Sequence, residues 1–500
     1  MSSIQITPSW QSQGTPLRHT WAGLGNIDQF RWFVRKDCLD QLKLAHDELG
    51  LRHVRAVGMF DDELRVLCVD PTKWRDKERK SIPRTNWQIV DYAIESLLEI
   101  GIKPMFTTCF TPSALASGTR TVFSTKGNIT LPKDYAEWER FVADSARHAI
   151  HRFGLEEVRS WYFEVWNEPN LQDFFAGTQK DLFELWQRTY SGLKSVDSGL
   201  RIGGPSTARS EWIRETIDWT RKNDCEPDYI ISHCYNNDSA FGALSPFAGP
   251  QEDKSNTSPN FTSGVVRGCR AILKEFDYRG ELHFNEWGRT WHPCDFQRES
   301  ENEAAFIAKT MAEVSQEADY FAYWCLSDIY DQVGYGAETF HGNYGMMNLQ
   351  GIRKPSWHAH SLLRKLGSTQ VEAQIIGQEG LLNVLATSGE DAFHLLVHDY
   401  RYDAVLTESA QLRVALPSDL GETPQLHLWR VGASENNAPA LWRQMGSPAY
   451  LRREEKLALV EASHLQESLG AVRIERGPSG LEAVFESPRP GVALLEMARI

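Results

Sequence analysis

Residues 134–170 read DYAEWERFVADSARHAIHRFGLEEVRSWYFEVWNEPN, an amphipathic segment followed by a short apolar one. Over 134–153 the apolar side chains recur every three or four residues, which predicts a helix with one buried face. Asp134 is suited to cap its start, and Gly154 can end it in the left-handed conformation. The apolar run that follows predicts a strand. Pro169 stops this strand, because proline lacks an N–H and restricts the residue before it.

The same alternation of strands and helices extends in both directions along the chain. Eight strands are predicted at 17–25, 53–60, 104–110, 161–169, 201–206, 229–235, 282–287 and 320–328. The other helices are predicted at 37–49, 87–100, 180–196, 210–223, 263–277 and 301–316. The strands are apolar almost throughout, as strands covered on both faces are. This order predicts an α/β fold, a (β/α)8 TIM barrel, over residues 17–360.

The sequence after about residue 370 has a different character. Short alternating segments between Gly, Pro and Asn turns predict an antiparallel β-sandwich, so we assign a second domain to residues 361–500. One helix near 453–467 interrupts it. The N-terminal segment, residues 1–16, contains SIQIT and can add a strand to the sandwich. A chain of 500 residues is long enough for both domains.

Composition excludes several classes of protein. The net charge is −14 and no run of Lys and Arg offers a local positive field, which argues against nucleic acid as a partner. No stretch is apolar and long enough to span a membrane, and MSSIQITPSWQSQG lacks the features of a signal peptide. None of the 8 cysteines forms a CxxC pair or a zinc spacing with histidine, so we expect no metal or other cofactor. Buried, reduced thiols indicate a cytoplasmic protein, and a homo-oligomer stays open as its assembly state.

Two glutamates are the strongest catalytic candidates in the sequence. Glu168 ends the strand at 161–169, and Glu286 ends the strand at 282–287. The C-terminal ends of barrel strands are where barrel enzymes place their reacting groups. These strands are the fourth and seventh in the predicted order, so their ends face each other across the barrel mouth. A single glutamate of this kind is usually an exposed loop residue, whereas a matched pair indicates glycoside hydrolysis.

The neighbours of Glu168 suggest which of the two is the acid. Trp161, Trp166 and Phe174 are expected to surround it with apolar rings, and such a setting raises a carboxyl pKa. A gap of about 5–5.5 Å between the two carboxyl groups gives retention of configuration, and about 6.5–9.5 Å gives inversion. Spacing along the sequence leaves both outcomes open. Glu164, on the same strand, is expected to have a structural role.

Several longer pieces of the chain are more specific than the glutamates alone. They are ASGTRTVFSTKGNITLPKDYAEWERFV, RFGLEEVRSWYFEVWNEPNL, RIGGPS, FNEW, AYWCLSDIY, FHGNYGM, LWRQMGSP and SPRPGVALLE. In these pieces the chain resembles glycoside hydrolase family 39, and most closely its β-xylosidases. The resemblance implies a barrel with a β-sandwich and a retaining mechanism. It also implies that Glu168 is the acid/base and Glu286 the nucleophile.

The resemblance implies a set of substrate-binding residues as well. Asn167 matches the asparagine that hydrogen-bonds the sugar 2-hydroxyl, His233 matches a histidine lining the sugar site, and Trp324 matches an aromatic floor. We expect the neighbouring side chains of Tyr235, Trp287 and Asp331 to complete the set.

The chain departs from the β-xylosidase pattern at three positions around the sugar. Val57 stands where a histidine is expected, and Thr107 and Asp331 stand where glutamates are expected. The predicted function is therefore a retaining β-xylosidase that acts on short oligosaccharides, with a β-glucoside, arabinoside or uronide as the alternative substrate. A non-catalytic carbohydrate-binding barrel is the more distant alternative.

Overall fold

The computed structural model describes residues 3–69, 83–238, 258–332, 334, 336–377, 380–401, 408–478 and 480–499. Contacts between residues divide the chain into two compact units. One unit comprises residues 23–291 and 317–335, and the other comprises residues 1–22, 292–316 and 336–500. The domain boundaries near residues 16 and 360 follow the order of the chain and stay a prediction.

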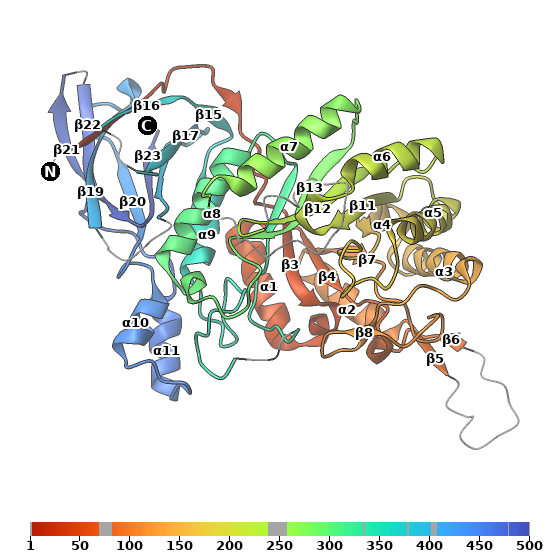
Figure 1. Cartoon of the computed structure of the whole chain (residues 1–500). Coiled ribbons are helices and arrows are strands. Elements are labelled where there is room, and N and C mark those ends of the chain that lie inside the picture. Colours follow the sequence, from red (N-terminus) through yellow and green to blue (C-terminus); the bar gives the residue numbers. More distant parts are fainter. Residues whose placement is uncertain are drawn as a thin grey trace, which may run out of the picture. The chain divides into compact units, whose positions relative to one another are not determined.

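Eight parallel strands form the centre of the first unit (Figure 1). In sheet order they are β14 (Tyr320–Tyr323), β13 (Glu281–Gly288), β12 (Tyr229–Tyr235), β11 (Arg201–Thr207), β10 (Tyr162–Glu164), β7 (Lys103–Thr107), β4 (His53–Val57) and β3 (Leu24–Gln29). The N–H of Leu326 donates to the carbonyl of Asn26 at 2.9 Å. The side-chain amide of Asn26 donates to the carbonyl of Tyr323 at 3.2 Å. These bonds join β3 to the end of β14, so the sheet closes and the predicted barrel is confirmed.

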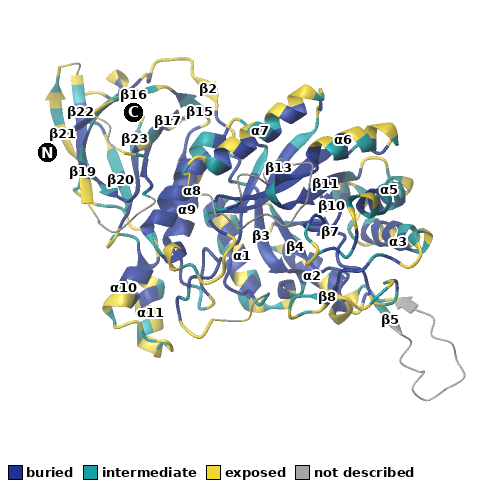
Figure 2. Ribbon diagram, in the orientation of Figure 1, coloured by how far each residue is buried: buried dark blue, intermediate teal, exposed yellow. Residues whose placement is uncertain are grey.

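The helices of this unit lie close to their predicted positions. They are α1 (Lys36–Leu49), α2 (Gln88–Glu99), α3 (Tyr135–Phe153), α5 (Gln179–Val196), α6 (Ile213–Lys222) and α7 (Phe261–Glu275). The Asp134 carboxylate caps α3 by accepting from the N–H groups of Ala136 and Glu137. Gly154 ends it with φ 91° and ψ 150°, so its φ is positive but its ψ is extended rather than helical. Figure 2 shows the strands buried and the outer faces of the helices exposed.

The sequence did not reveal several short elements of this unit, and two differences bear on the barrel. The short helix α4 (Leu155–Arg159) follows α3 directly. The first strand lies at Leu24–Gln29, not at 17–25, because its sequence LGNIDQ is rich in polar residues and carries no apolar signal. All six of its residues are nevertheless buried.

The interior of the barrel is arranged in layers. Its apolar layer includes Met105, Tyr162 and Tyr229, and the Tyr162 ring lies 5.1 Å from that of His283. Side chains two positions apart on a strand point to the same side. Consequently Thr107, Glu164 and Asn285 follow Met105, Tyr162 and His283 in the next layer towards the C-terminal ends of the strands. Together with Arg55 of β4 they form a buried layer that we call the polar floor.

The second unit contains the predicted β-sandwich. Its five-stranded sheet has the order β16 (Ala373–Ile376), β1 (Ile4–Pro8), β19 (Glu408–Ala415), β22 (Gly480–Arg489), β21 (Arg473–Gly477). Its six-stranded sheet has the order β2 (Thr15–Pro16), β15 (Thr369–Val371), β17 (Asn383–Ser388), β18 (Ala392–Asp399), β23 (Gly491–Ala498), β20 (Leu426–Val431). The strands pair antiparallel except for β1 with β19. One core is shared by both sheets, with Ile6, Leu412 and Phe485 from the first and Leu395 and Leu495 from the second.

Four helices accompany the sheets of the second unit. They are α8 (Glu301–Val314), α9 (Pro355–Lys365), α10 (Ala438–Gln444) and α11 (Arg453–Ala462). The helices predicted at 301–316 and near 453–467 are α8 and α11, and α9 and α10 were not predicted. Within the described part of the chain, no helix has the length and the apolar character that crossing a membrane requires.

Candidate active site

Glu168 stands directly beyond β10, where the chain turns sharply. Trp166 and Glu168 both have left-handed backbone, with φ of 66° and 45°, which side chains rarely adopt. The N–H of Glu168 donates to the carbonyl of Ser206 at 2.9 Å, which holds this turn against β11. Strained backbone of this kind is found at functional sites, where the surrounding structure holds it. Glu168 as a whole is only 8% exposed.

Glu286 lies on β13 and accepts hydrogen bonds from two side chains. Arg55 Nη1 donates to Glu286 Oε2 at 3.2 Å, and the Tyr235 hydroxyl donates to Glu286 Oε1 at 2.8 Å. The pairing between β12 and β13 shifts by one residue just before His233, so that His233 stands opposite Glu286. This shift brings Glu286, and not only Asn285, into the barrel.

His233 joins the two glutamates. Its Nδ1 lies 3.0 Å from Glu168 Oε1 and 3.5 Å from Glu286 Oε2. One carboxylate oxygen of Glu168 and one of Glu286 lie within 4.8 Å of each other. The two glutamates predicted from their strand ends therefore converge on one point of the barrel mouth.

The polar floor lies directly beneath them and is centred on Arg55. Arg55 Nε and Nη2 donate to the two oxygens of Glu164 at 2.7 and 3.1 Å, and Nη2 also donates to Asn167 Oδ1. The Thr107 hydroxyl donates to Glu164 Oε2 at 2.7 Å, and Asn285 Nδ2 donates to Oε1 at 2.9 Å. Arg55 and Glu164 are both fully buried. Glu164 therefore has the structural role expected for it.

Burial and charge move the three carboxyl pKa values in different directions. Burial raises the pKa of Glu168 to about 7, and the positive charges of Arg55 and Arg209 only partly oppose it. Burial also raises the pKa of Glu286, against the lowering effects of His233, Arg55 and the Tyr235 hydroxyl. Burial alone would raise the pKa of Glu164 as well, but the charge and hydrogen bonds of Arg55 outweigh it and lower that pKa.

The aromatic surroundings expected for Glu168 are wrong in detail. The Trp166 ring packs against Phe110 and Phe175, with centroids 5.7 and 5.2 Å away, and its Nε1 donates to a backbone carbonyl. Trp161 precedes the strand, and its Nε1 donates to Glu157. Burial is what raises the pKa of Glu168, while the ring contacts of Trp166 and the hydrogen bond of Trp161 are made with other residues.

The structure brings four of the predicted substrate-binding residues to the two glutamates. His233 and Tyr235 contact them directly, and Asn167 contacts Arg55. The Arg55 guanidinium lies 5.9 Å from the centre of the Trp324 ring, which places that ring on the same cluster.

The other two predicted substrate-binding residues, Trp287 and Asp331, contact different side chains. Trp287 is fully buried, with its ring 4.5 Å from that of Phe321, because it follows Glu286 on the strand and points to the other side. Asp331 accepts from Arg31 Nη2 at 2.7 Å and from the Ser124 hydroxyl, in a cluster beyond the ends of β3 and β14. Neither side chain is among those that the structure places in contact with the two glutamates.

Arg55 is the principal site residue that the sequence analysis missed. A signal was present, since HVRAV carries one charged residue inside an apolar strand. A fully buried charge requires a partner, and a carboxylate on another strand supplies it here.

A metal site is not assigned to this cluster. Glu168, His233 and Glu286 each offer one ligand atom within 4.8 Å of the others. Arg55 Nη1, however, already lies 3.2 Å from Glu286 Oε2. A second cation beside this guanidinium would be repelled.

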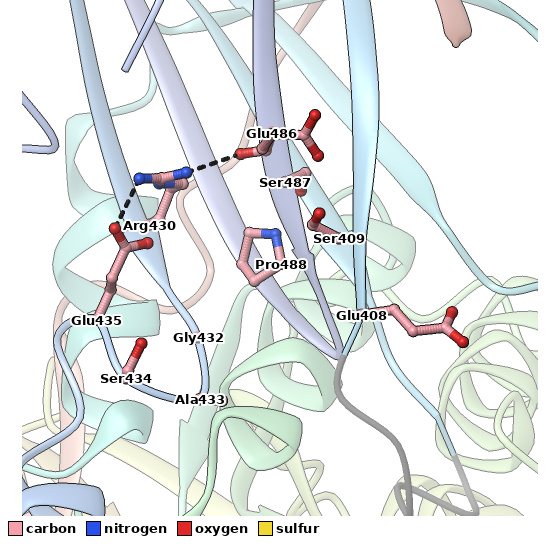
Figure 3. Close-up of a pocket in the computed structure, with 10 residues that line it drawn as sticks. All are labelled: Glu408, Ser409, Arg430, Gly432, Ala433, Ser434, Glu435, Glu486, Ser487 and Pro488. Atoms are coloured by element: carbon pink, nitrogen blue, oxygen red, sulfur yellow. Dashed lines mark hydrogen bonds and ion pairs between the residues drawn. The ribbon is translucent and has the colours of Figure 1, made fainter. Parts of the chain in front are cut away.

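A hollow in the sandwich provides a contrast (Figure 3). It has a volume of about 170 Å³, and Arg430 lies along it, donating to Glu435 Oε1 at 2.6 Å. The ten described residues that line it include no aromatic ring on which a sugar would stack. We assign no function to this hollow.

Comparison with known proteins identifies the chain. The profile of glycosyl hydrolases family 39 matches residues 3–476. A β-xylosidase of Caldicellulosiruptor saccharolyticus is 34% identical over 472 residues, which are 93% of this chain and 92% of that protein. A β-xylosidase of Geobacillus stearothermophilus is 30% identical over 427 residues, 84% of this chain and 82% of that protein. The crystal structure of a monomeric β-xylosidase from Caulobacter crescentus CB15 superposes with a TM-score of 0.86, at 28% identity, over 99% of both chains.

The fold and these matches define the class of the protein as a (β/α)8-barrel glycoside hydrolase. Within that class the chain belongs to glycoside hydrolase family 39. The resemblance seen in the sequence is confirmed.

Proposed function

We propose that this glycoside hydrolase is a retaining β-xylosidase, with Glu168 as acid/base and Glu286 as nucleophile. The observation that carries the retaining mechanism is the approach of the two carboxylates to within 4.8 Å of each other. Retention needs a gap of about 5–5.5 Å, whereas inversion needs room for a water molecule between acid and base.

The first step is formation of a covalent glycosyl-enzyme. Glu168 gives its proton to the glycosidic oxygen while a Glu286 oxygen attacks the anomeric carbon. The raised pKa of Glu168, about 7, keeps that proton available near neutral pH. The hydrogen bonds of Arg55 and Tyr235 to Glu286 favour its ionised form, which the attack requires.

The second step releases the sugar. Glu168, now ionised, takes a proton from a water molecule, and the hydroxide attacks the anomeric carbon and displaces Glu286. The configuration at that carbon is kept because it is inverted twice.

Asn167 is proposed to bind the sugar 2-hydroxyl. Its Oδ1 already accepts from Arg55, so the side-chain NH₂ is the group left to donate. Such a bond becomes stronger as charge develops on the ring in the transition state. Trp324, beside Arg55, is proposed as the aromatic surface beneath the sugar. A substrate-binding role for Trp287 and Asp331 stays a prediction.

Xylose is the proposed sugar because both of the relatives compared over most of the chain are β-xylosidases. Thr107 does not have the glutamate side chain of the β-xylosidase pattern, and its hydroxyl contacts Glu164 instead. The Asp331 carboxylate accepts hydrogen bonds from Arg31 and Ser124. These contacts concern recognition of the sugar, so β-glucosides, arabinosides and uronides are the substrates to compare. A panel of nitrophenyl glycosides ranks them by kcat/KM.

Two measurements test the proposal. With xylobiose, proton NMR should show the β-anomer of xylose first, and the α-anomer appearing first would exclude retention. A 2-deoxy-2-fluoro xyloside with a good leaving group should label the enzyme, and peptide mass analysis should find the label on Glu286. A label on another residue would show that the nucleophile is wrong.

A cytoplasmic location is also proposed. Seven of the 8 cysteines are free thiols, and six of these seven are buried. Free thiols are typical of reducing compartments. Cell fractionation with an antibody to the protein tests this location, and recovery from the medium would contradict it.

A further inference from the structure

Ser206 occupies an unusual place on β11. The pairing between β11 and β12 shifts between Pro205 and Thr207, which leaves Ser206 without a partner residue on β12. Such shifts in register re-aim a side chain and are common beside active sites. Ser206 is fully buried, has a φ of 57°, and its carbonyl accepts from the N–H of Glu168. Its hydroxyl lies between Glu164 and His233.

The hydroxyl proton of Ser206 points to Glu164. Glu164 is ionised, because Arg55 contacts both of its oxygens, and an ionised carboxylate only accepts hydrogen bonds. The Ser206 hydroxyl therefore donates to Glu164 Oε1. A hydroxyl has one proton, so towards His233 Nε2, 3.2 Å away, the Ser206 oxygen can only accept.

This arrangement determines which nitrogen of His233 carries the proton. Burial lowers the pKa of His233 to about 4, so the ring is neutral near neutral pH and has one N–H. Since Ser206 can only accept, its hydrogen bond with the ring forms only when that N–H is on Nε2. Nδ1 then presents a lone pair to Glu168 Oε1 at 3.0 Å. Two acceptors cannot share a hydrogen bond, so the contact is favourable only when Glu168 is protonated.

We propose that Ser206 is a positioning residue that selects the Nε2–H tautomer of His233 and thereby stabilises the protonated form of Glu168. The inference rests on the proposed role of Glu168 as the acid. It assigns to Ser206, Glu164 and Arg55 a function at a carboxyl group that none of their side chains touches.

The other charged groups around Glu168 act differently. Arg55 and Arg209 favour the ionised form of Glu168, and Glu164 favours its protonated form. Arg209 lies in η4 (Ala208–Ser210). Asp238, whose own pKa is raised to about 7 by burial, also interacts with it. Around His233 the charges are Glu286, Arg55 and Glu164. Glu286 Oε2, 3.5 Å from Nδ1, favours a proton on that nitrogen, whereas Ser206, 3.2 Å from Nε2, favours one on Nε2. Asn285 also hydrogen-bonds the His233 side chain.

The first experiment reads the tautomer and needs no substrate. In protein labelled with 15N-histidine, the chemical shifts of the two ring nitrogens identify the protonated one, and His233→Gln identifies which signals belong to His233. The wild type is expected to show the Nε2–H tautomer near neutral pH. Ser206→Ala and Ser206→Gly are expected to show a mixture. An Nδ1–H tautomer in the wild type would overturn the inference, whatever sugar the enzyme cleaves.

The second experiment measures the pKa of Glu168 from the 13C shift of its labelled carboxyl carbon, assigned by its loss in Glu168→Gln. Ser206→Ala and Ser206→Gly should lower this pKa by about 1 unit, the size expected for one hydrogen bond. The glycine variant accepts the positive φ without strain, so an effect common to both variants comes from the hydroxyl. An unchanged pKa in both would overturn the inference.

Ser232→Ala is the matched control. Ser232 is as buried as Ser206 and lies next to His233, but its hydroxyl donates to Ser210. Neither the tautomer nor the pKa of Glu168 should change, and a shift as large as that in Ser206→Ala would also overturn the inference. If the tautomer and the pKa behave as expected while no glycoside is cleaved, the inference about Ser206 stands and the proposed function fails.

Discussion

Glu164 and Glu168 stand four residues apart on one segment, and both are buried, yet their pKa values move in opposite directions. Glu164, in the polar floor, accepts hydrogen bonds from Arg55, Thr107, Asn285 and Ser206. At the barrel mouth, Glu168 has His233 as the side chain at hydrogen-bonding distance among the described residues. Burial acts to raise the pKa of both carboxyl groups, and at Glu164 the charge and hydrogen bonds of its donors outweigh it.

The difference separates two uses of a buried carboxylate. A carboxylate that is supplied with donors stays ionised and holds the structure together. One that lacks donors keeps its proton near neutral pH and can give it to a substrate. The following variants test this distinction.

The largest expected effect is on catalysis at Glu168. Glu168→Gln keeps the shape but cannot give a proton, so kcat/KM for xylobiose should fall about 1,000-fold. For a dinitrophenyl xyloside, whose leaving group needs no proton, the first step should be much less affected. Pre-steady-state kinetics of both substrates checks this contrast. Equal losses for both substrates would show that Glu168 is not the acid.

The next effect is on stability, at Glu164. Glu164→Gln breaks the fully buried pair with Arg55 and leaves Glu286 as the remaining charged partner, and breaking a buried pair costs about 3–5 kcal/mol. Urea unfolding at pH 7 should show this loss. Glu168→Gln, at equal burial, should not lower the free energy of unfolding. If both variants lost the same amount, the two carboxylates would not differ in the way described.

The third effect is on the pH dependence of stability. The pKa of Glu168 is about 7 in the folded protein against 4.5 as its ordinary value, so between these pH values the folded state holds a proton that the unfolded state has lost. Stability from this group is therefore complete below pH 4.5 and is lost as the pH rises through 7, by about 3 kcal/mol. The difference in unfolding free energy between wild type and Glu168→Gln, measured from pH 4.5 to 8, isolates this group. A flat difference would contradict the raised pKa.

The smallest effect compares two adjacent threonines. Thr107→Val removes a donor to Glu164 and should cost about 1.5 kcal/mol, the lower end for hydrogen bonds to charged groups. Thr108 is equally buried, and its hydroxyl has no hydrogen-bond partner among the described residues. Thr108→Val should therefore leave the unfolding free energy unchanged or raise it. A larger loss of unfolding free energy in Thr108→Val than in Thr107→Val would contradict a stabilising role of the polar floor.

The sequence predicted much of the barrel because its signals are local. The helix at 134–153 follows from the spacing of apolar residues within a few turns, and the observed helix begins one residue later. The predicted position of the first strand was wrong because many of its residues are polar yet buried. The side chain of one of them, Asn26, bonds to β14 at the other edge of the sheet. Local patterns carry no information about such partners.

In the site, too, some residues could be predicted from the local sequence and others could not. Glu168 and Glu286 are recognisable because each closes an apolar run of the sequence. The placement of Trp287 depends on the shift in register between β12 and β13, because Asn285 and Glu286 both enter the barrel and Trp287 then points to the other side. Arg55 and Ser206 were not recognised, because one depends on carboxylates more than 100 residues away and the other on a shift in register between strands.

Arg55 also restricts how this chain can evolve. One guanidinium serves Glu164, Glu286 and Asn167, which come from separate strands or strand ends. A lineage that lost Glu164 alone would leave Arg55 with Glu286 as its remaining charged partner, and one that lost Arg55 alone would leave two buried carboxylates without their shared guanidinium. Substitutions at these two positions are therefore expected to occur together or not at all, even in descendants that have changed the sugar they cleave.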